Sequence, residues 1–270
     1  MGGALYEMHG FYLPPAICGG GLLVVAMISI ALMCLAKHPP NEDQTREPKS
    51  NDQPLQEETT YWKLIKMPGI LLCFYSLFVA RLTTSWYLPS LQPFLEEHFQ
   101  FSPTMVGVMF MIDGCVYAFF NPIGGLILDK TRDKHVHMLL AGMIGAMIGF
   151  SMLGPAPFLT FLPKSIYVVG LGLTIGGAFV AMIFITTLMY SMNISVANGA
   201  AETEQTQGMV ISLWLSSQYI ACYLGTAVGG TAYDAFGFEY STLIVIGLQI
   251  TAIVAIAMYH IIGKMKTKTG

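Results

Sequence analysis

Seven stretches of this sequence are long and apolar enough to cross a membrane. Each holds about 20 or more mostly apolar residues, the length that spans the hydrocarbon core of a bilayer. They cover approximately residues 12–35, 68–95, 104–128, 136–155, 164–191, 208–232 and 241–263. The 270 residues are 54% hydrophobic and only 11% charged, whereas a soluble domain is about one-quarter charged. The sequence therefore predicts an all-α polytopic membrane protein with seven transmembrane helices.

Lys and Arg are distributed unevenly between the connecting segments. In order after the first span, the connectors carry five, none, three, one, none and none of them, and the C-terminal tail carries three. Alternate sides thus carry eleven and one, and the positive-inside rule places the richer side in the cytoplasm. We predict that the 36–66 linker, the 129–135 loop and the C-terminus are cytoplasmic. The N-terminus and the turns at 96–103 and 233–240 then face the lumen or exterior.

Two charged residues, Arg81 and Asp113, lie deep in predicted spans. An ionisable side chain at mid-membrane costs at least about 2.5 kcal/mol on insertion scales, so it normally faces a cavity or a partner. Helical spacing extends each residue into a polar stripe, and the 208–232 span offers a third wall. The predicted walls are Arg81 with Thr84 and Ser85, Asp113 with Tyr117 and Asn121, and Trp214 with Ser217 and Gln218. We interpret them as a water-accessible cavity that binds substrate or protons.

Asp113 has two interpretations. In the first, it binds a cation or carries a proton; burial favours its protonated form, whereas pairing with Arg81 favours its ionised form. In the second, Arg81 and Asp113 form a fixed ion pair that holds two helices together, since structural ion pairs also perturb ionisation. The sequence leaves both open.

A glycine followed by an acidic residue and a basic cluster ends the third predicted span. Asp129 stands four residues after Gly125, and Lys130 begins the basic cluster. This spacing suits a helix end that packs tightly and carries an ion-pair network. An ordinary basic cytoplasmic turn is the simpler interpretation.

Several kinds of site are not indicated by the sequence. Its five cysteines lie at scattered spacings inside apolar runs, which favours neither a disulfide framework nor a metal site. His135 and His137 lack convincing further ligands, and we expect them to be solvated. No nucleophile–base pair, phosphate loop or basic tract indicates an enzyme, a bound cofactor or a nucleic-acid partner.

One glycine-containing pattern occurs twice. Gly-Gly, Tyr, an acidic residue, Gly and Phe recur at the same spacing in 2–11 and 229–238. Such a repeat indicates two related halves, and we expect most of the first half to lie upstream of Met1; two similar helix-end turns are the alternative. Glycine also lets helix backbones approach closely in lipid. The glycines predicted to pack in this way are Gly225, Gly229 and Gly230.

Two runs resemble signatures of the major facilitator superfamily. The 125–134 run is similar to G-x-x-x-D-R/K, which helps gate the cytoplasmic side in that family, with Arg132 where glycine is expected and Asp133 where arginine is. The 225–230 run is similar to the proton-antiporter signature G-P-x-x-G-G, with Thr226 in place of proline.

Further stretches resemble the vesicular amine transporter family, and within it the polyamine-transporter branch. They are residues 2–14, 61–65, 94–99 and 153–157. The resemblance covers nearly the whole chain and implies the family's sixth to twelfth helices. Leu88 stands where the family commonly carries an acidic residue, so either Asp113 supplies the counter-charge or the substrate differs.

The resemblance also implies a division of the chain. Residues 1–35 form a luminal turn and the last helix of an N-terminal half, and 36–66 form the central cytoplasmic linker with an interfacial segment. Residues 67–263 form a six-helix C-terminal half, followed by a cytoplasmic tail at 264–270. We expect a missing N-terminal half to be a partner.

The function implied is proton-coupled antiport of a small organic cation, such as a polyamine or a monoamine. In such folds the substrate site lies at mid-membrane between two halves, so we expect 270 residues alone not to transport. The expected setting is the lipid bilayer of a vesicle or another endomembrane, or alternatively the plasma membrane. A seven-helix receptor fits the helix count and orientation, and a truncated, non-transporting assembly partner is a further alternative.

Overall fold

The computed structural model describes residues 13–35, 60–131, 134–154 and 163–269. They form the helices α2 (Leu13–Leu35), α3 (Tyr61–Ile65), α4 (Pro68–Phe99), α5 (Pro103–Lys130), α6 (His135–Leu153), α7 (Ile166–Ala197) and α8 (Glu204–Thr269). Within these ranges there is no strand, so the all-α prediction is correct. Helices α4 to α8 are each long and apolar enough to cross a membrane. The first copy of the glycine repeat, most of the linker, and Arg132 with Asp133 lie outside the described residues.

Proline and serine set where the helices begin. Pro68 and Pro103 occupy the first turn of α4 and α5, where the missing N–H of proline costs little because that group has no helical partner. Ser102 accepts a hydrogen bond from the Met105 backbone N–H (3.4 Å), which satisfies a donor that the first turn leaves free. The span starts predicted at 68 and 104 therefore fall within one residue of the observed starts.

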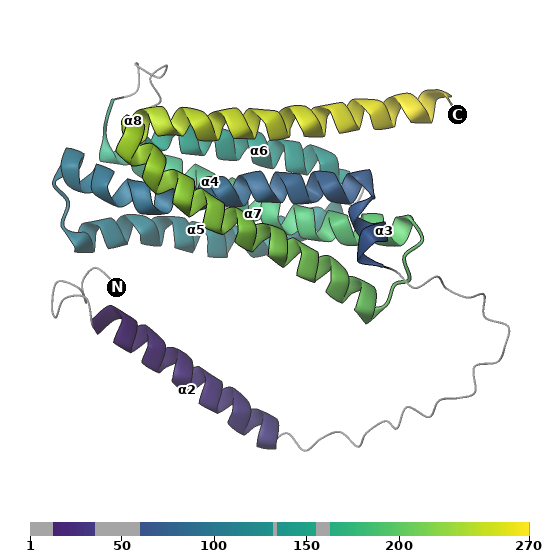
Figure 1. The fold of residues 1–270 in the computed structure, drawn as a ribbon, viewed down its shortest axis with the longest axis horizontal. Coiled ribbons are helices and arrows are strands. Elements are labelled where there is room, and N and C mark those ends of the chain that lie inside the picture. The colour runs from purple at the N-terminus through teal and green to yellow at the C-terminus, as the bar shows by residue number, and fades with distance from the viewer. Residues whose placement is uncertain (1–12, 36–59, 132–133, 155–162, 270) are drawn as a thin grey trace.

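The predicted turn at 233–240 is wrong in its extent. Helical geometry runs from Glu204 to Thr269 except at Gly237, whose φ of 74° and ψ of 172° interrupt it. That backbone region is essentially restricted to glycine. One residue therefore redirects the chain, and the two predicted spans follow each other as the two legs of α8 (Figure 1).

The bundle is built around α4. This helix packs against both α7 and α8, while α6 packs against α7 and α8, and α5 packs against α7. In Figure 1, α2 lies apart from the bundle, and all of its described side chains are exposed. The assignment of α2 to a separate N-terminal half stays a prediction.

The residue after the bend anchors α8 in the core. Phe238 is 4% exposed, and its ring stacks on Trp86 and Phe94 of α4, with centroids 5.3 and 4.5 Å away. At Gly154, which caps α6, a Cβ atom would lie 2.3 Å from the Phe238 ring. The bend thus delivers an aromatic side chain into a space that α4 provides and Gly154 keeps open.

We predict that Gly237→Ala destabilises the protein by about 1–3 kcal/mol, because alanine disfavours this backbone conformation. No atom lies within 4 Å of a Cβ at this position, so the loss is conformational rather than steric. Thermal unfolding of the purified protein in detergent measures it. Gly247→Ala, in the helical second leg and equally uncrowded, should not lower the midpoint, since alanine favours helix over glycine. Equal midpoints for the wild type and Gly237→Ala would contradict this account of the bend.

Candidate functional site

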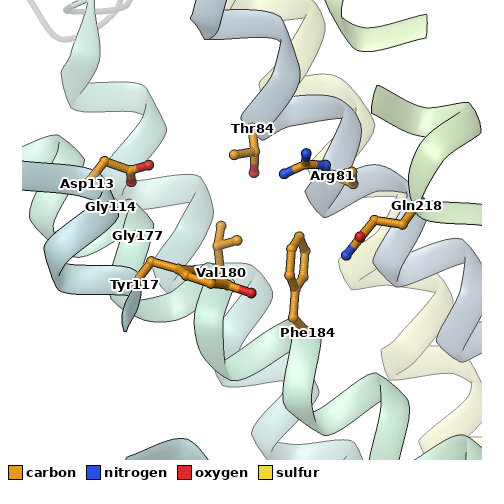
Figure 2. A pocket seen from close by; sticks show the side chains of 9 residues that line it. All are labelled: Arg81, Thr84, Asp113, Gly114, Tyr117, Gly177, Val180, Phe184 and Gln218. Carbon is orange, nitrogen blue, oxygen red and sulfur yellow. The ribbon is translucent and has the colours of Figure 1, made fainter. Parts of the chain in front are cut away.

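A cavity of about 250 Å³ lies among α4, α5, α7 and α8. Its walls are Arg81 and Thr84 from α4, Asp113, Gly114 and Tyr117 from α5, Gly177, Val180 and Phe184 from α7, and Gln218 from α8. In Figure 2, Asp113 and Arg81 lie on opposite sides of this space, with Tyr117, Val180 and Phe184 between them. The fold therefore brings together four of the six residues predicted to bind substrate or protons: Arg81, Asp113, Tyr117 and Gln218.

The carboxyl group of Asp113 is oriented by α4. The Tyr87 hydroxyl donates a hydrogen bond to Asp113 Oδ2 at 2.6 Å. The Tyr87 side chain is 1% exposed, and its ring lies against Phe110 and Phe150, with centroids 6.3 and 5.7 Å away. Packing holds this ring in place, so its hydrogen bond determines the position of the Asp113 carboxyl group.

Gly177 of α7 provides the space for that carboxyl group. A Cβ atom at Gly177 would lie 2.7 Å from Asp113 Oδ1 and 3.3 Å from the Asp113 backbone oxygen. Any side chain here would push α7 away from α5 or displace the carboxyl group. The glycine therefore serves the cavity as well as helix packing.

Arg81 makes a weak contact on the opposite wall. Its guanidinium donates a hydrogen bond to Cys222 Sγ at 3.6 Å, and its buried Nε has no hydrogen-bond partner. Arg81 and Asp113 are not within ion-pairing distance of each other. The hypothesis of a fixed Arg81–Asp113 pair that holds two helices together therefore does not describe this structure.

Two predicted wall residues do not line the cavity. Trp214 lies behind it, where its indole N–H donates to Thr187 Oγ1 at 3.2 Å and its ring meets Phe184 edge to face, at 6.2 Å between centroids. Trp214 thus positions a lining residue without reaching the space itself. Asn121, one turn beyond Tyr117 on α5, is half-buried and also outside the lining.

Of the remaining predicted polar positions, Ser217 and Thr84 donate hydrogen bonds to backbone oxygens, whereas the buried Ser85 hydroxyl has no hydrogen-bond partner among the described residues. Ser217 donates to the Phe74 backbone oxygen at 3.3 Å, and Thr84 donates to the Ala80 backbone oxygen at 2.8 Å. Of these, only Thr84 lines the cavity. Ser85 is fully buried and outside the lining.

Sequence reasoning missed Tyr87, which contacts Asp113 directly. A usable signal was present, because Tyr87 lies three residues after Thr84 and six after Arg81 on one helix. Six residues correspond to about 9 Å of rise, so its hydroxyl also falls well inside the membrane rather than at the interface. Gly177 and Phe184 carry no such signal, since only packing reveals what they face.

The motif proposed as a cytoplasmic gate lies at the far end of α5. Gly125 and its neighbour Gly124 pack against Ile185 of α7, where added Cβ atoms would lie 3.4 and 3.2 Å from its side chain. Asp129 and Lys130 are exposed in the last turn. Asp129 is sixteen residues, or about 24 Å of helix, from Asp113, so this motif and the cavity are separate. Its gating role stays a prediction.

The expectation that His135 is solvated is wrong. His135 is 7% exposed, its ring stacks on Tyr190 at 5.3 Å between centroids, and its Nε2 lies 3.2 Å from Asn193 Nδ2. It is buried because α6 begins at this residue and packs against α7. His137 is exposed and meets His260 edge to face. The described part of the chain contains no cluster of three or more residues suited to a metal ion.

The predicted packing glycines lie where α8 meets α4. Cβ atoms at Gly225 and Gly229 would lie 2.4 Å from the Leu82 oxygen and 2.3 Å from the Trp86 oxygen. Gly230 differs, because no heavy atom lies within 4 Å of a Cβ built there. Two glycines four residues apart therefore place the α8 backbone directly on the α4 backbone, and the third does not take part.

Comparison with known proteins identifies the family. The model of the Major Facilitator Superfamily matches residues 1–201 and residues 73–268. The chain belongs to the Major Facilitator Superfamily. Family membership supports a transporter rather than a receptor or an enzyme, in agreement with the absence of enzymatic motifs from the sequence.

The chain is also similar to individual transporters of mammals. It is 25% identical to the MFS-type transporter SLC18B1 of Mus musculus over 89% of the chain and 49% of that relative. The proteins of the same name from Homo sapiens and Rattus norvegicus are 25% identical over 90% and 97% of the chain and 50% and 54% of the relative. The chain thus spans about half the length of these relatives.

We predict that Gly229→Ala destabilises the protein by about 1–3 kcal/mol, because the added methyl group overpacks a backbone-to-backbone contact. Gly230→Ala is the matched control one residue away, where the methyl group meets open space. Thermal unfolding in detergent compares the two. A Gly230→Ala variant that loses as much stability as Gly229→Ala would contradict this account, since alanine favours helix over glycine and the methyl group at this position meets no contact with α4.

Proposed function

We propose that this chain forms the substrate-binding half of a secondary transporter that exchanges protons for a small organic cation. The observation that carries the proposal is the Asp113 carboxyl group, which faces a cavity inside the helical bundle and has no ion-pair partner among the described residues. At mid-membrane depth such a group is costly unless it meets a cation or a proton. Tyr87 and Gly177 orient it and keep its space open, which is the arrangement of a binding site.

The other lining side chains suit an organic ammonium ion. Tyr117 and Phe184 meet edge to face at 5.9 Å between ring centroids, and an aromatic face attracts a desolvated cation. Gln218 adds an amide oxygen that can accept a hydrogen bond from an N–H group. One carboxylate among the lining residues matches one ammonium group. A polyamine would need a second acidic group supplied from outside the described chain.

Exchange follows from competition for one carboxyl group. A proton and an organic cation each neutralise Asp113, and the two cannot occupy the same oxygens together. If the site faces one compartment at a time, release of a proton on one side permits a cation to bind there. Reorientation then returns the cation to the side that supplied the proton, which is antiport.

We further propose that another helical body covers the cavity. Gly114 lines the cavity and is also exposed, and so are its neighbours Met111 and Cys115 on α5. A polar space of this kind is not stable against hydrocarbon. The resemblance to relatives of twice this length makes an N-terminal half the expected partner. A non-transporting form of the chain alone is the outcome expected when that half is absent.

The proposed location and substrate class rest on the resemblance to vesicular amine transporters. We place the protein in the membrane of an acidified vesicle or another endomembrane, where a proton gradient drives cation uptake. Uptake of labelled polyamines and monoamines into acidified vesicles that contain the full-length protein distinguishes the two substrate classes. Abolition of uptake by a protonophore would support proton coupling, whereas unchanged uptake would exclude it.

We predict that Asp113→Asn lowers net uptake at least about tenfold, since an amide can neither bind a proton nor neutralise a cation. Asp234→Asn makes the same chemical change at an exposed position outside the cavity and should retain wild-type uptake. Both are measured as protonophore-sensitive uptake in vesicles. Wild-type uptake by Asp113→Asn would refute the carrier role.

We also predict that Gly177→Ala weakens cation binding about tenfold, because a methyl group at this point displaces the Asp113 carboxyl group that supplies the counter-charge. Gly170→Ala on the same helix is the control, since its Cβ would meet one side-chain atom at an ordinary 3.9 Å. Equilibrium binding of a labelled cation to purified protein measures both. Equal affinities would show that the carboxyl group does not depend on this space.

A further inference from the structure

Arg81 is poorly satisfied in the position that it occupies. Its contact is a thiol sulfur at 3.6 Å, which is a weak acceptor. Its Nε is buried and has no hydrogen-bond partner in the described part of the chain, although an unpaired buried donor is costly. A guanidinium at membrane depth normally pairs with an acid or a backbone carbonyl. The observed position is therefore one that Arg81 would leave if a better acceptor became available.

A better acceptor lies across the same cavity. Asp113 and Arg81 both line it, and Figure 2 shows their side chains on opposite walls. Tyr87 donates to one carboxylate oxygen, Oδ2, and a carboxylate accepts several hydrogen bonds. The guanidinium is planar and presents its donors as a fork that matches a carboxylate.

We propose that Arg81 is a movable counter-ion of Asp113. When the carboxylate is ionised and empty, the guanidinium crosses the cavity and pairs with it. When a proton or an organic cation neutralises the carboxylate, Arg81 returns to Cys222, the arrangement seen here. The inference rests on the proposed role of Asp113 as the cation site.

The charge balance explains what this movement achieves. With a proton or a monovalent cation on Asp113, the Arg81–Asp113 cavity carries one net positive charge in either case. With the site empty it carries none, because the two side chains neutralise each other. The emptied site therefore does not present a bare carboxylate at membrane depth, and each ligand must displace the same competitor. Proton and cation become equivalent ligands, which an exchanger requires.

Cys222 reports the position of Arg81. A guanidinium beside a thiol favours the thiolate, which is the form that alkylating reagents attack. The experiment measures the alkylation rate of Cys222 by N-ethylmaleimide in the full-length protein in detergent at fixed pH, resolved by mass spectrometry. Free N-acetylcysteine under the same conditions provides the reference rate, and Cys73 is fully buried and should stay unmodified.

The variants form a double-mutant cycle. Asp113→Asn removes the competing carboxylate, so Arg81 stays at Cys222 and the alkylation rate of Cys222 should rise about threefold to tenfold relative to the wild type. In an Arg81→Gln background the same change should have no effect. Asp234→Asn, the same substitution at an exposed site outside the cavity, should leave the rate unchanged. Arg81→Met repeats the test should Arg81→Gln not fold.

The outcomes separate this inference from the proposed function. An unchanged Cys222 rate in Asp113→Asn would overturn the movable counter-ion, and so would an equal increase in the presence and absence of Arg81. Neither of these two alkylation measurements requires a cation to bind. If the uptake experiment shows no proton-coupled cation transport, the proposed function fails. The movement of Arg81 is still tested by the alkylation rates of Cys222.

Discussion

The structure depends on the direct contact of the α8 backbone with the α4 backbone at Gly225 and Gly229. Small residues matter more in a membrane than in water, because apolar side chains gain little by leaving lipid for one another and close packing must hold the helices together. The contact also fixes the rotation of α8 about its own axis. Cys222, three residues before Gly225 on the same face, is thereby placed beside Arg81, and Gln218 is placed at the cavity. The packing of α8 on α4 therefore also positions the side chains of the site.

The bend at Gly237 secures this arrangement from the other end. It requires one residue with a backbone conformation essentially restricted to glycine, and it inserts Phe238 between Trp86 and Phe94. Nearby, the Tyr233 hydroxyl donates to Glu97 at 3.1 Å, and Lys164 forms an ion pair with Glu239. These contacts tie both legs of α8 to α4 and to the segment that leads into α7. At the end of the bundle opposite the gate motif, these contacts therefore hold α8 against its neighbours.

Inside this frame the two membrane-depth charges are held apart rather than paired. Asp113 is held by a rigid tyrosine and given space by a glycine, whereas Arg81 rests on a weak acceptor. This asymmetry distinguishes a binding site from a structural ion pair, since a structural pair would bring the two groups into contact. In the proposed function, this carboxylate binds protons and organic cations in turn, and the guanidinium is its alternative partner inside the protein.

The sequence by itself determined the all-α membrane class, the approximate span boundaries and the two charged residues that line the cavity, because these follow from length, hydropathy and the cost of charge in lipid. Four of the six predicted binding residues meet at one cavity, since helical spacing orders side chains along one helix. Only the tertiary structure decided which faces of different helices meet. Tyr87 reaches Asp113 across 26 residues and Arg81 reaches Cys222 across 141, while Trp214 and Asn121 fall outside the cavity and His135 is buried. The physical reason is that membrane helices are apolar on most faces, so their rotation is set by packing against neighbours and leaves little trace in hydrophobic periodicity.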